Sequence, residues 1–131
     1  MTEEIPFTFE YRDYPLIPIK FHSDKRETPL IDALLDSGGD FIVIPYAIAK
    51  YLGLKLVKAG CVDTAGGETT LCKSNVTMVI YGKDKKFTYQ NIEIHVSDRN
   101  DLPVLLGRKP IFEDHEIIFR KYDNKLILKS I

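Results

Sequence analysis

The sequence predicts an all-β protein, a closed barrel-like sheet with one or two short helices. Three observations support this prediction. Apolar and polar residues alternate in several short segments, which is the pattern of half-buried strands. Gly66-Gly67 lies between two such segments and suits a two-residue hairpin turn. Only two short stretches have helical spacing or helix-start signals, so a meander that closes on itself is the expected arrangement.

The composition fits one globular domain, residues 1–131. The chain is 44% hydrophobic and 28% charged, which is enough for a core, and its net charge of −1 argues against a nucleic-acid partner. The apolar runs are too short to cross a membrane and the first residues lack a signal-peptide pattern, so we expect a cytoplasmic protein without a membrane partner. Two cysteines and three scattered histidines do not form a metal-ligand set, and no cofactor is expected.

The first third of the chain is predicted to form three strands. A charged turn at residues 22–27 separates the second strand from the third, residues 28–35, which ends at Asp36. The first two strands have apolar residues at alternate positions, namely Phe7, Phe9 and Tyr11, then Ile17, Ile19 and Phe21.

A strand at residues 41–44 and a short helix at residues 45–52 should follow. Pro45 suits the first turn of this helix and Gly53 suits its C-terminal cap.

Residues 54–81 are expected to form a long hairpin with Gly66-Gly67 at its tip. In that register Asp63 faces Thr70 and Cys61 faces Cys72. A disulfide is then geometrically possible, but reducing compartments keep such thiols apart, so free thiols are favoured.

The second half of the chain continues as strands. A turn at residues 82–85 separates two of them, and the chain ends in a hairpin over residues 116–128. His95 is expected to be exposed, because Ile92, Ile94 and Val96 point to the other face of its strand. His115, which stands among acidic residues after the short helix, is expected to be exposed too.

Asp36 is the most unusual residue of the chain. The segment Asp36-Ser37-Gly38 stands between two apolar strands, where an ionised carboxylate costs several kcal/mol unless it is paired, hydrogen-bonded or protonated. The triplet is also ordinary turn chemistry, and by composition it occurs by chance in roughly one chain in twenty of this length. Alone it does not establish a function.

A second motif makes the first more specific. Residues 102–106 are apolar, end in Gly107-Arg108 and lead into a short helix with Pro110 in its first turn. An apolar D-[ST]-G-x-D segment followed by an apolar G-R segment resembles the retropepsins, the single-domain aspartic proteases of retroviral type. The resemblance covers most of the chain, from about residue 15 to residue 128.

The resemblance implies an aspartic endopeptidase that acts as a symmetric homodimer. Peptide hydrolysis by aspartates needs two carboxylates, one to take a proton from water and one to give a proton to the scissile carbonyl. This chain has one copy of the triplet, so a two-fold axis must bring two Asp36 side chains together.

The resemblance also assigns the surrounding residues. The Ser37 hydroxyl should form a hydrogen bond to the other chain of the dimer and hold the two active-site turns together. Gly38 should let the backbone approach the two Asp36 carboxylates. Gly39 stands where the family commonly has alanine. Asp40 should form a buried supporting ion pair with Arg108.

The hairpin at about residues 56–80 should be the flap that closes over substrate, with Ala65, Gly66 and Gly67 at its tip. An extended peptide or unfolded protein would bind beneath it. Two rival functions remain: a catalytically inactive dimeric module of the same fold that binds peptides or proteins, and a plain β-barrel interaction domain in which Asp36 is only a turn residue.

Overall fold

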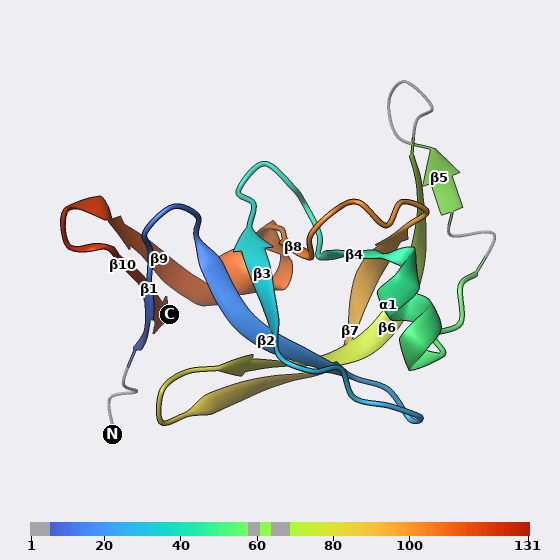
Figure 1. Cartoon of the computed structure of the whole chain (residues 1–131), viewed down its shortest axis with the longest axis horizontal. Helices are drawn as coiled ribbons and strands as arrows, with labels where there is room; N and C mark the ends of the chain where they lie inside the picture. The colour runs from blue at the N-terminus through green and yellow to red at the C-terminus, as the bar shows by residue number, and fades with distance from the viewer. Residues whose placement is uncertain (1–5, 58–60, 64–68) are drawn as a thin grey trace.

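The computed structural model describes residues 6–57, 61–63 and 69–131 (Figure 1). The strands are β1 (Phe7–Glu10), β2 (Leu16–His22), β3 (Ile31–Leu35), β4 (Val43–Pro45), β5 (Cys61–Asp63), β6 (Thr70–Tyr81), β7 (Lys86–Ser97), β8 (Leu105–Leu106), β9 (His115–Arg120) and β10 (Lys125–Ser130). The helical segments are α1 (Tyr46–Leu52), η2 (Arg108–Phe112) and η3 (Lys121–Asp123). The molecule is therefore mostly β, as predicted.

The larger sheet closes on itself. Its strand order is β2-β3-β8-β4-β7-β6, and a second pairing of β6 with β2 completes the ring, while β5 extends β6 on the outside. Alternate residues of β2 point inward, and Ile17, Ile19 and Phe21 are fully buried. Burial of each such side chain stabilises the fold by about 1.5–3 kcal/mol. The prediction of a closed all-β barrel is confirmed.

The strand of the second motif, β8, pairs with both strands that flank the first motif. β3 runs parallel to β8, with Leu34 beside Leu105, and β4 runs antiparallel to β8, with Val43 opposite Leu105. The loop that leaves β3 at its upper end in Figure 1 and leads to β4 contains Asp36. The end of β3 is thus fixed by the strand that precedes Arg108.

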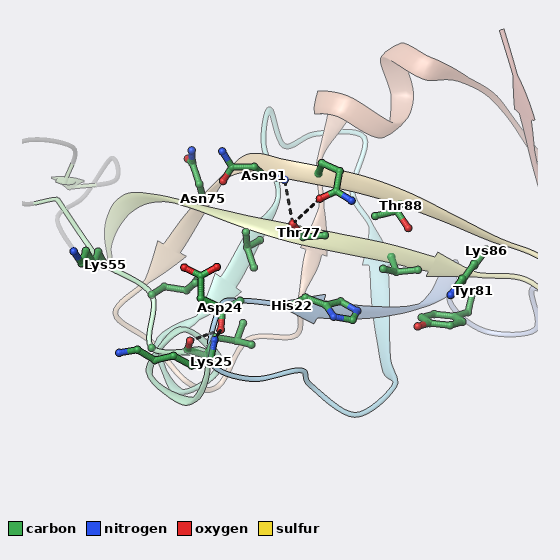
Figure 2. A pocket seen from close by; sticks show the side chains of 17 residues that line it. His22, Asp24, Lys25, Lys55, Asn75, Thr77, Tyr81, Lys86, Thr88 and Asn91 are labelled. Atoms are coloured by element: carbon green, nitrogen blue, oxygen red, sulfur yellow. Dashed lines mark hydrogen bonds between the residues drawn. The ribbon is translucent and has the colours of Figure 1, made fainter.

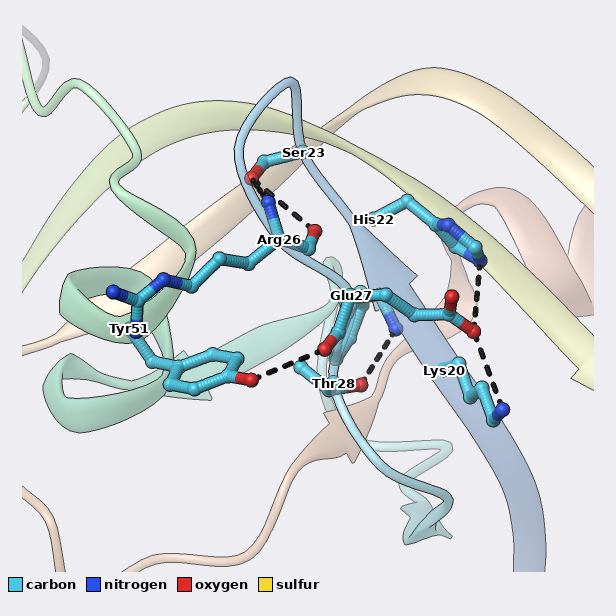
Figure 3. Close-up of polar contacts among 8 residues, drawn as sticks. Lys20, His22, Ser23, Arg26, Glu27, Thr28 and Tyr51 are labelled. Carbon is cyan, nitrogen blue, oxygen red and sulfur yellow. Dashed lines mark hydrogen bonds and ion pairs between the residues drawn. The ribbon is translucent and has the colours of Figure 1, made fainter.

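The turn after β2 is tied to α1 by polar contacts (Figure 3). The Tyr51 hydroxyl donates to the Glu27 carbonyl at 3.3 Å, as Figure 3 shows. Ser23 Oγ also donates to the Leu52 carbonyl, at 2.6 Å. The helix ends at Leu52 and is capped by Gly53, whose φ of 69° is the left-handed conformation that glycine adopts without strain. The predicted helix and its cap are present.

The hairpin of β5 and β6 has the predicted register. Asp63 is opposite Thr70 and Cys61 is opposite Cys72. The two cysteines are joined in a disulfide, so the expectation of free thiols is wrong. Directly opposed positions on two antiparallel strands place their Cβ atoms close enough for a disulfide. Here this geometry outweighs the expectation that a reducing compartment keeps the thiols apart. The expected tip, Ala65, Gly66 and Gly67, lies outside the described residues.

A second sheet, in the order β1-β10-β9, lies beside the barrel at the left of Figure 1. Its described contacts with the barrel include a hydrogen bond from the Tyr89 hydroxyl of β7 to Asp114 Oδ2, at 3.0 Å, just before β9. His115 is 4% exposed and its Nδ1 lies 3.0 Å from the Ile111 carbonyl. The expectation of an exposed His115 is therefore wrong, because β9 turns this side chain inward beneath η2.

Replacement of Tyr89 by phenylalanine should destabilise the fold by about 1 kcal/mol, the usual net contribution of one hydrogen bond. Burial, together with the hydrogen bond and the charge of Asp114, raises the pKa of the Tyr89 hydroxyl. Wild-type stability should therefore also decline as the pH rises above about 10, because Tyr89 ionises in the unfolded chain and stays neutral in the folded one. The variant should lack the part of this decline that Tyr89 causes. Urea unfolding at pH 7 and pH 10.5 measures both effects.

Tyr81→Phe is the matched control, because the described structure gives the Tyr81 hydroxyl no hydrogen bond. Equal losses in the two variants would contradict the role assigned to Tyr89.

Among the described residues, no helix combines the length and the apolar character that a membrane crossing requires.

Candidate active site

Asp36 is held at the end of β3 by backbone hydrogen bonds. Its N–H donates to the Leu106 carbonyl at 2.9 Å, and the N–H of Leu34 donates to the Val104 carbonyl at 2.8 Å. Leu35 is buried, whereas Asp36 itself is only half-buried. The barrel therefore fixes the backbone of Asp36 and leaves its carboxylate at the rim.

The glycines of the turn make room for this carboxylate. Gly38 N–H donates to Asp36 Oδ1 at 3.1 Å, and Gly39 N–H donates to the Asp36 carbonyl at 3.2 Å. A Cβ at position 39 would lie 3.1 Å from Asp36 Oδ2, tighter than most such contacts. Gly39 therefore relieves crowding at the second oxygen, a feature that the sequence pattern alone did not indicate.

The second motif supports the same turn from the other side. The N–H groups of Arg108 and Lys109 donate to the carbonyls of Gly39 and Asp40, each at 2.9 Å. The Arg108 guanidinium also forms an ion pair with the Asp40 carboxylate. Two segments far apart in sequence are thus joined by main-chain and side-chain bonds.

The ion pair of Asp40 and Arg108 is on the surface of the single chain. The side chains of Arg108 and Asp40 are 55% and 65% exposed, so the expectation of a buried pair is wrong for one chain. Both residues lie on turns at the barrel rim, and no described element covers them. An exposed pair of this kind contributes about 1 kcal/mol or less.

Gly107 allows the closest backbone approach at the site. A Cβ at this position would lie 2.3 Å from the Phe41 carbonyl oxygen and 2.7 Å from the Phe41 nitrogen. Backbone atoms cannot move aside as a flexible side chain can. The glycine before Arg108 is therefore required by packing, a role that sequence reasoning had not given it.

Phe41 extends this packing to β7. Its ring lies 4.4 Å, centre to centre, from the imidazole of His95, and Lys109 Nζ is 5.6 Å from the ring centre. His95 is half-buried, so the expectation of an exposed histidine is wrong: the aromatic ring that follows the active-site turn covers it. Burial lowers the pKa of His95, Glu93 opposes this change and Lys73 adds to it.

His95→Gln should improve stability at acid pH relative to wild type. The unfolded histidine takes up a proton near its ordinary pKa of 6.5, whereas the folded one does so only at lower pH. Wild-type stability is therefore lost as the pH falls through about 6.5, and this loss should be absent from the variant. Urea midpoints at pH 7 and pH 5 measure the difference.

His22→Gln is the control, because it makes the same substitution at the end of β2, where His22 Nε2 lies 3.7 Å from Glu27 and not against Phe41. If the difference between wild type and His95→Gln is the same at both pH values, His95 is not responsible for the acid sensitivity.

The predicted residues assemble only in part within one chain. Asp36, Ser37, Gly38, Gly39, Asp40 and Arg108 form one continuous turn and its support. In the part of the chain that the structure describes, the Asp36 carboxylate accepts a hydrogen bond only from Gly38 and has no ion-pair partner. Asp40 is engaged by Arg108. One chain thus presents one uncommitted carboxylate, which can act as base or acid but not as both.

A cavity of about 680 Å³ lies elsewhere, between the β6–β7 hairpin and the turn after β2 (Figure 2). His22, Asp24, Lys25, Lys55, Asn75 and Thr77 are among the residues that line it, and none of the predicted site residues does. No group of three or more His, Cys, Asp or Glu suited to a metal occurs among the described residues.

A closed barrel with an Asp-Ser-Gly turn supported by a Gly-Arg segment defines the retropepsin-like class of fold and site. Residues 20–109 match the family model described as "Aspartyl protease", and the chain belongs to this aspartyl protease family. The resemblance to retropepsins is thereby confirmed. No curated protein sequence matches the chain significantly.

Solved structures show the same fold. A retropepsin-like aspartic protease from Rickettsia conorii superposes with a TM-score of 0.63 at 22% identity, covering 99% of this chain and 95% of that one. The retroviral protease-like domain of Ddi1 from Leishmania major gives 0.58 at 12% identity, with coverages of 90% and 94%. The EIAV protease, solved with the inhibitor HBY-793, gives 0.51 at 17% identity, with coverages of 80% and 91%.

Proposed function

We propose that this protein is an aspartic endopeptidase whose active site forms between two identical chains. The observation that supports the proposal most strongly is the placement of Asp36: a half-exposed carboxylate at the end of a fixed strand, on a turn held by the Gly107-Arg108 segment. Membership of the aspartyl protease family supports the same reaction.

The chemistry requires two carboxylates that share one proton. The ionised Asp36 takes a proton from water while the water oxygen bonds to the scissile carbonyl carbon, and the protonated Asp36 of the second chain gives its proton to the carbonyl oxygen. The carboxyl group that took the proton from water then gives it to the amine nitrogen as the C–N bond breaks. The other carboxylate takes a proton from a hydroxyl of the tetrahedral intermediate, so the acid and amine products leave and the pair again shares one proton. Two neighbouring carboxylates cannot both ionise. One Asp36 therefore stays ionised and the other stays protonated, which are the two forms that the reaction needs.

The surrounding residues take supporting roles in this proposal. Ser37, which is exposed on one chain, hydrogen-bonds to the second copy. Gly38 and Gly39 keep space for water and substrate beside the carboxylate. Asp40 and Arg108 fix the turn, and their exposure in one chain leaves them available for burial at a dimer interface.

The substrate is an extended peptide or an unfolded protein. It adds a strand through main-chain hydrogen bonds, and the hairpin at about residues 56–80, with Ala65, Gly66 and Gly67 at its tip, closes over it and excludes water. The domain spans residues 1–131 in this proposal.

The test is digestion of a denatured protein mixture between pH 3 and pH 8, with the mass in solution determined in parallel. A dimer that cleaves supports the proposal. A folded dimer that cleaves nothing in this range would contradict it and favour the inactive peptide-binding module. A monomer that does not cleave would support the interpretation that the protein is a plain β-barrel interaction domain and that Asp36 is only a turn residue.

A further inference from the structure

The cavity between the β6–β7 hairpin and the turn after β2 carries an excess of positive charge. Its described lining includes Lys25, Lys55 and Lys86 but one carboxylate, that of Asp24. None of these three lysines takes part in an ion pair within the described residues. The cavity therefore presents three uncommitted ammonium groups to an anionic ligand, on a chain whose net charge is −1.

Two of the lysines lie at opposite ends of the cavity. At one end the Lys55 carbonyl accepts the Ser74 hydroxyl at 2.8 Å, and at the other end Lys86 pairs with Tyr81 across the hairpin. Figure 2 shows Lys55 and Lys86 far apart on either side of the cavity. The part of β6 between them, residues 75–81, is about 20 Å long, because a strand rises about 3.3 Å per residue. A ligand that contacts both lysines must be extended.

The third lysine lies near the end marked by Lys55. A Cβ at Gly53 would be 3.0 Å from Lys25 Cδ, so the Lys25 side chain crosses the cap of α1, two residues before Lys55. One end of the cavity thus has two ammonium groups and the other end has one.

A β-bulge supplies hydrogen-bonding side chains between the two ends. The register of β6 and β7 shifts at Thr77, so that Gln90 and Asn91 both stand opposite it. Thr77 Oγ1 accepts the Asn91 N–H at 3.2 Å, and the Thr77 hydroxyl donates to Gln90 Oε1 at 3.5 Å, as Figure 2 shows. Asn91 has a φ of 48°, which asparagine tolerates better than most residues. The bulge therefore places two neighbouring side-chain amides in the wall of the cavity.

These amides match the backbone of an extended peptide. The Gln90 amide nitrogen and the Asn91 side chain form no hydrogen bond within the described structure, and the Asn75 side chain also forms none there. A side-chain amide both donates and accepts, as a peptide group does, so each can bond to the main chain of a bound strand.

The floor of the cavity is apolar, whereas the lysines stand at its rim. Leu52, Val76 and Val79 line it and are at most 5% exposed, and all three lysines are exposed. In an extended peptide, alternate side chains point to opposite sides. Apolar side chains of such a peptide can therefore rest on the floor while acidic ones meet the lysines.

We propose that this cavity binds an extended acidic segment of a partner protein. Carboxylates of the segment pair with Lys25 and Lys55 at one end and with Lys86 at the other, and its backbone bonds to the amides of the bulge. The site goes beyond the proposed protease function, because it needs neither Asp36 nor a second chain.

Two other anionic ligands fit the cavity less well. A small anion such as phosphate reaches one end only and leaves the other lysine unpaired. Single-stranded nucleic acid binds by stacking bases on aromatic rings. The described lining has one tyrosine, Tyr81, and the Lys20 ammonium already lies over its ring, 5.4 Å from the centre.

Fluorescence anisotropy with a labelled octapeptide of alternating glutamate and valine tests the proposal. The Asp36→Asn protein is used so that the probe is not cleaved, and wild type should bind it with the same affinity. The peptide with glutamine in place of glutamate should bind at least about tenfold more weakly, because it cannot pair with the lysines. Equal affinities for the two peptides would overturn an acidic ligand.

Charge reversal at each end tests the extended position of the ligand. Lys55→Glu and Lys86→Glu should each weaken binding at least about fivefold, and the double variant should show the product of the two effects, because the positions are about 20 Å apart. Lys129→Glu makes the same change of net charge on β10, outside the cavity, and is the control. It should leave the affinity within about twofold. An effect at one end alone, or an equal effect of Lys129→Glu, would contradict the proposal.

Nuclear magnetic resonance gives an independent readout that does not depend on a variant. The side-chain amide signals of Asn75, Gln90 and Asn91 should shift as the glutamate–valine peptide is added, whereas those of Asn124, beyond η3, should not. Shifts confined to residues outside the cavity would place the peptide elsewhere and overturn the site.

The outcomes separate this proposal from the proposed function. Peptide binding that depends on Lys55 and Lys86 supports the site even in a protein that cleaves nothing. No binding at peptide concentrations up to about 1 mM would overturn it, and Asp36-dependent cleavage would still support the protease. Displacement of the peptide by an equal concentration of inorganic phosphate, or tighter binding of a single-stranded oligonucleotide, would also overturn it.

Discussion

Replacement of Asp36 by asparagine is expected to reduce peptide cleavage by about a thousandfold or more while the protein remains folded and dimeric. Asparagine has nearly the same shape but can neither accept the proton from water nor share one with a second carboxylate. General acid–base catalysis by a positioned group typically contributes about 10²–10⁴-fold, and each symmetric substitution removes both the acid and the base. The initial rate of cleavage of a peptide substrate, at matched dimer concentration, measures the loss.

Asp32→Asn is the control for this experiment. Asp32 lies on β3, the strand that leads to Asp36, four positions before it, and is exposed. The same change of carboxylate to amide at this position should leave the cleavage rate within about twofold of wild type, because surface substitutions away from the core and the active site have small effects. If Asp36→Asn retains wild-type activity, Asp36 is not catalytic, whatever the fold.

Replacement of Gly107 by alanine should destabilise the protein by about 2–5 kcal/mol. The added Cβ would lie 2.3 Å from the Phe41 carbonyl oxygen, so the backbone must move, and Arg108 and Lys109 would lose their bonds to the active-site turn. We expect a large fall in the urea midpoint and a parallel loss of cleavage.

Gly38→Ala separates this clash from a general effect of removing glycine. A Cβ at position 38 would meet Asp36 Oδ1 at 3.4 Å, an ordinary contact, so stability should change by less than about 1 kcal/mol. Equal unfolding midpoints for the two variants would contradict the close approach between Gly107 and Phe41.

The sequence predicts those parts of the fold that depend on local pattern. Alternation identifies the buried face of β2, and the glycine pair sets the register that places Cys61 opposite Cys72. The two motifs also identify the turn at Asp36 and its partner Arg108, because both carry unusual residues at the ends of apolar strands.

Features that depend on tertiary packing are not visible in the sequence. The burial of His115 beneath η2, the contact of His95 with Phe41 and the steric need for Gly107 arise between segments far apart in sequence. The exposure of Asp40 and Arg108 is likewise a property of a chain considered without its second copy. The residue pattern of one strand does not show which distant segments of the chain pack against it.

Subunit mixing tests most directly the central proposal that the active site forms between two chains. Wild type is mixed with Asp36→Asn at constant total concentration, allowed to exchange, and assayed for cleavage. If each site needs one carboxylate from each chain, only wild-type dimers are active, and activity should fall with the square of the wild-type fraction, to about one quarter in an equal mixture. A linear fall to about one half would show that each chain acts alone and would contradict the account.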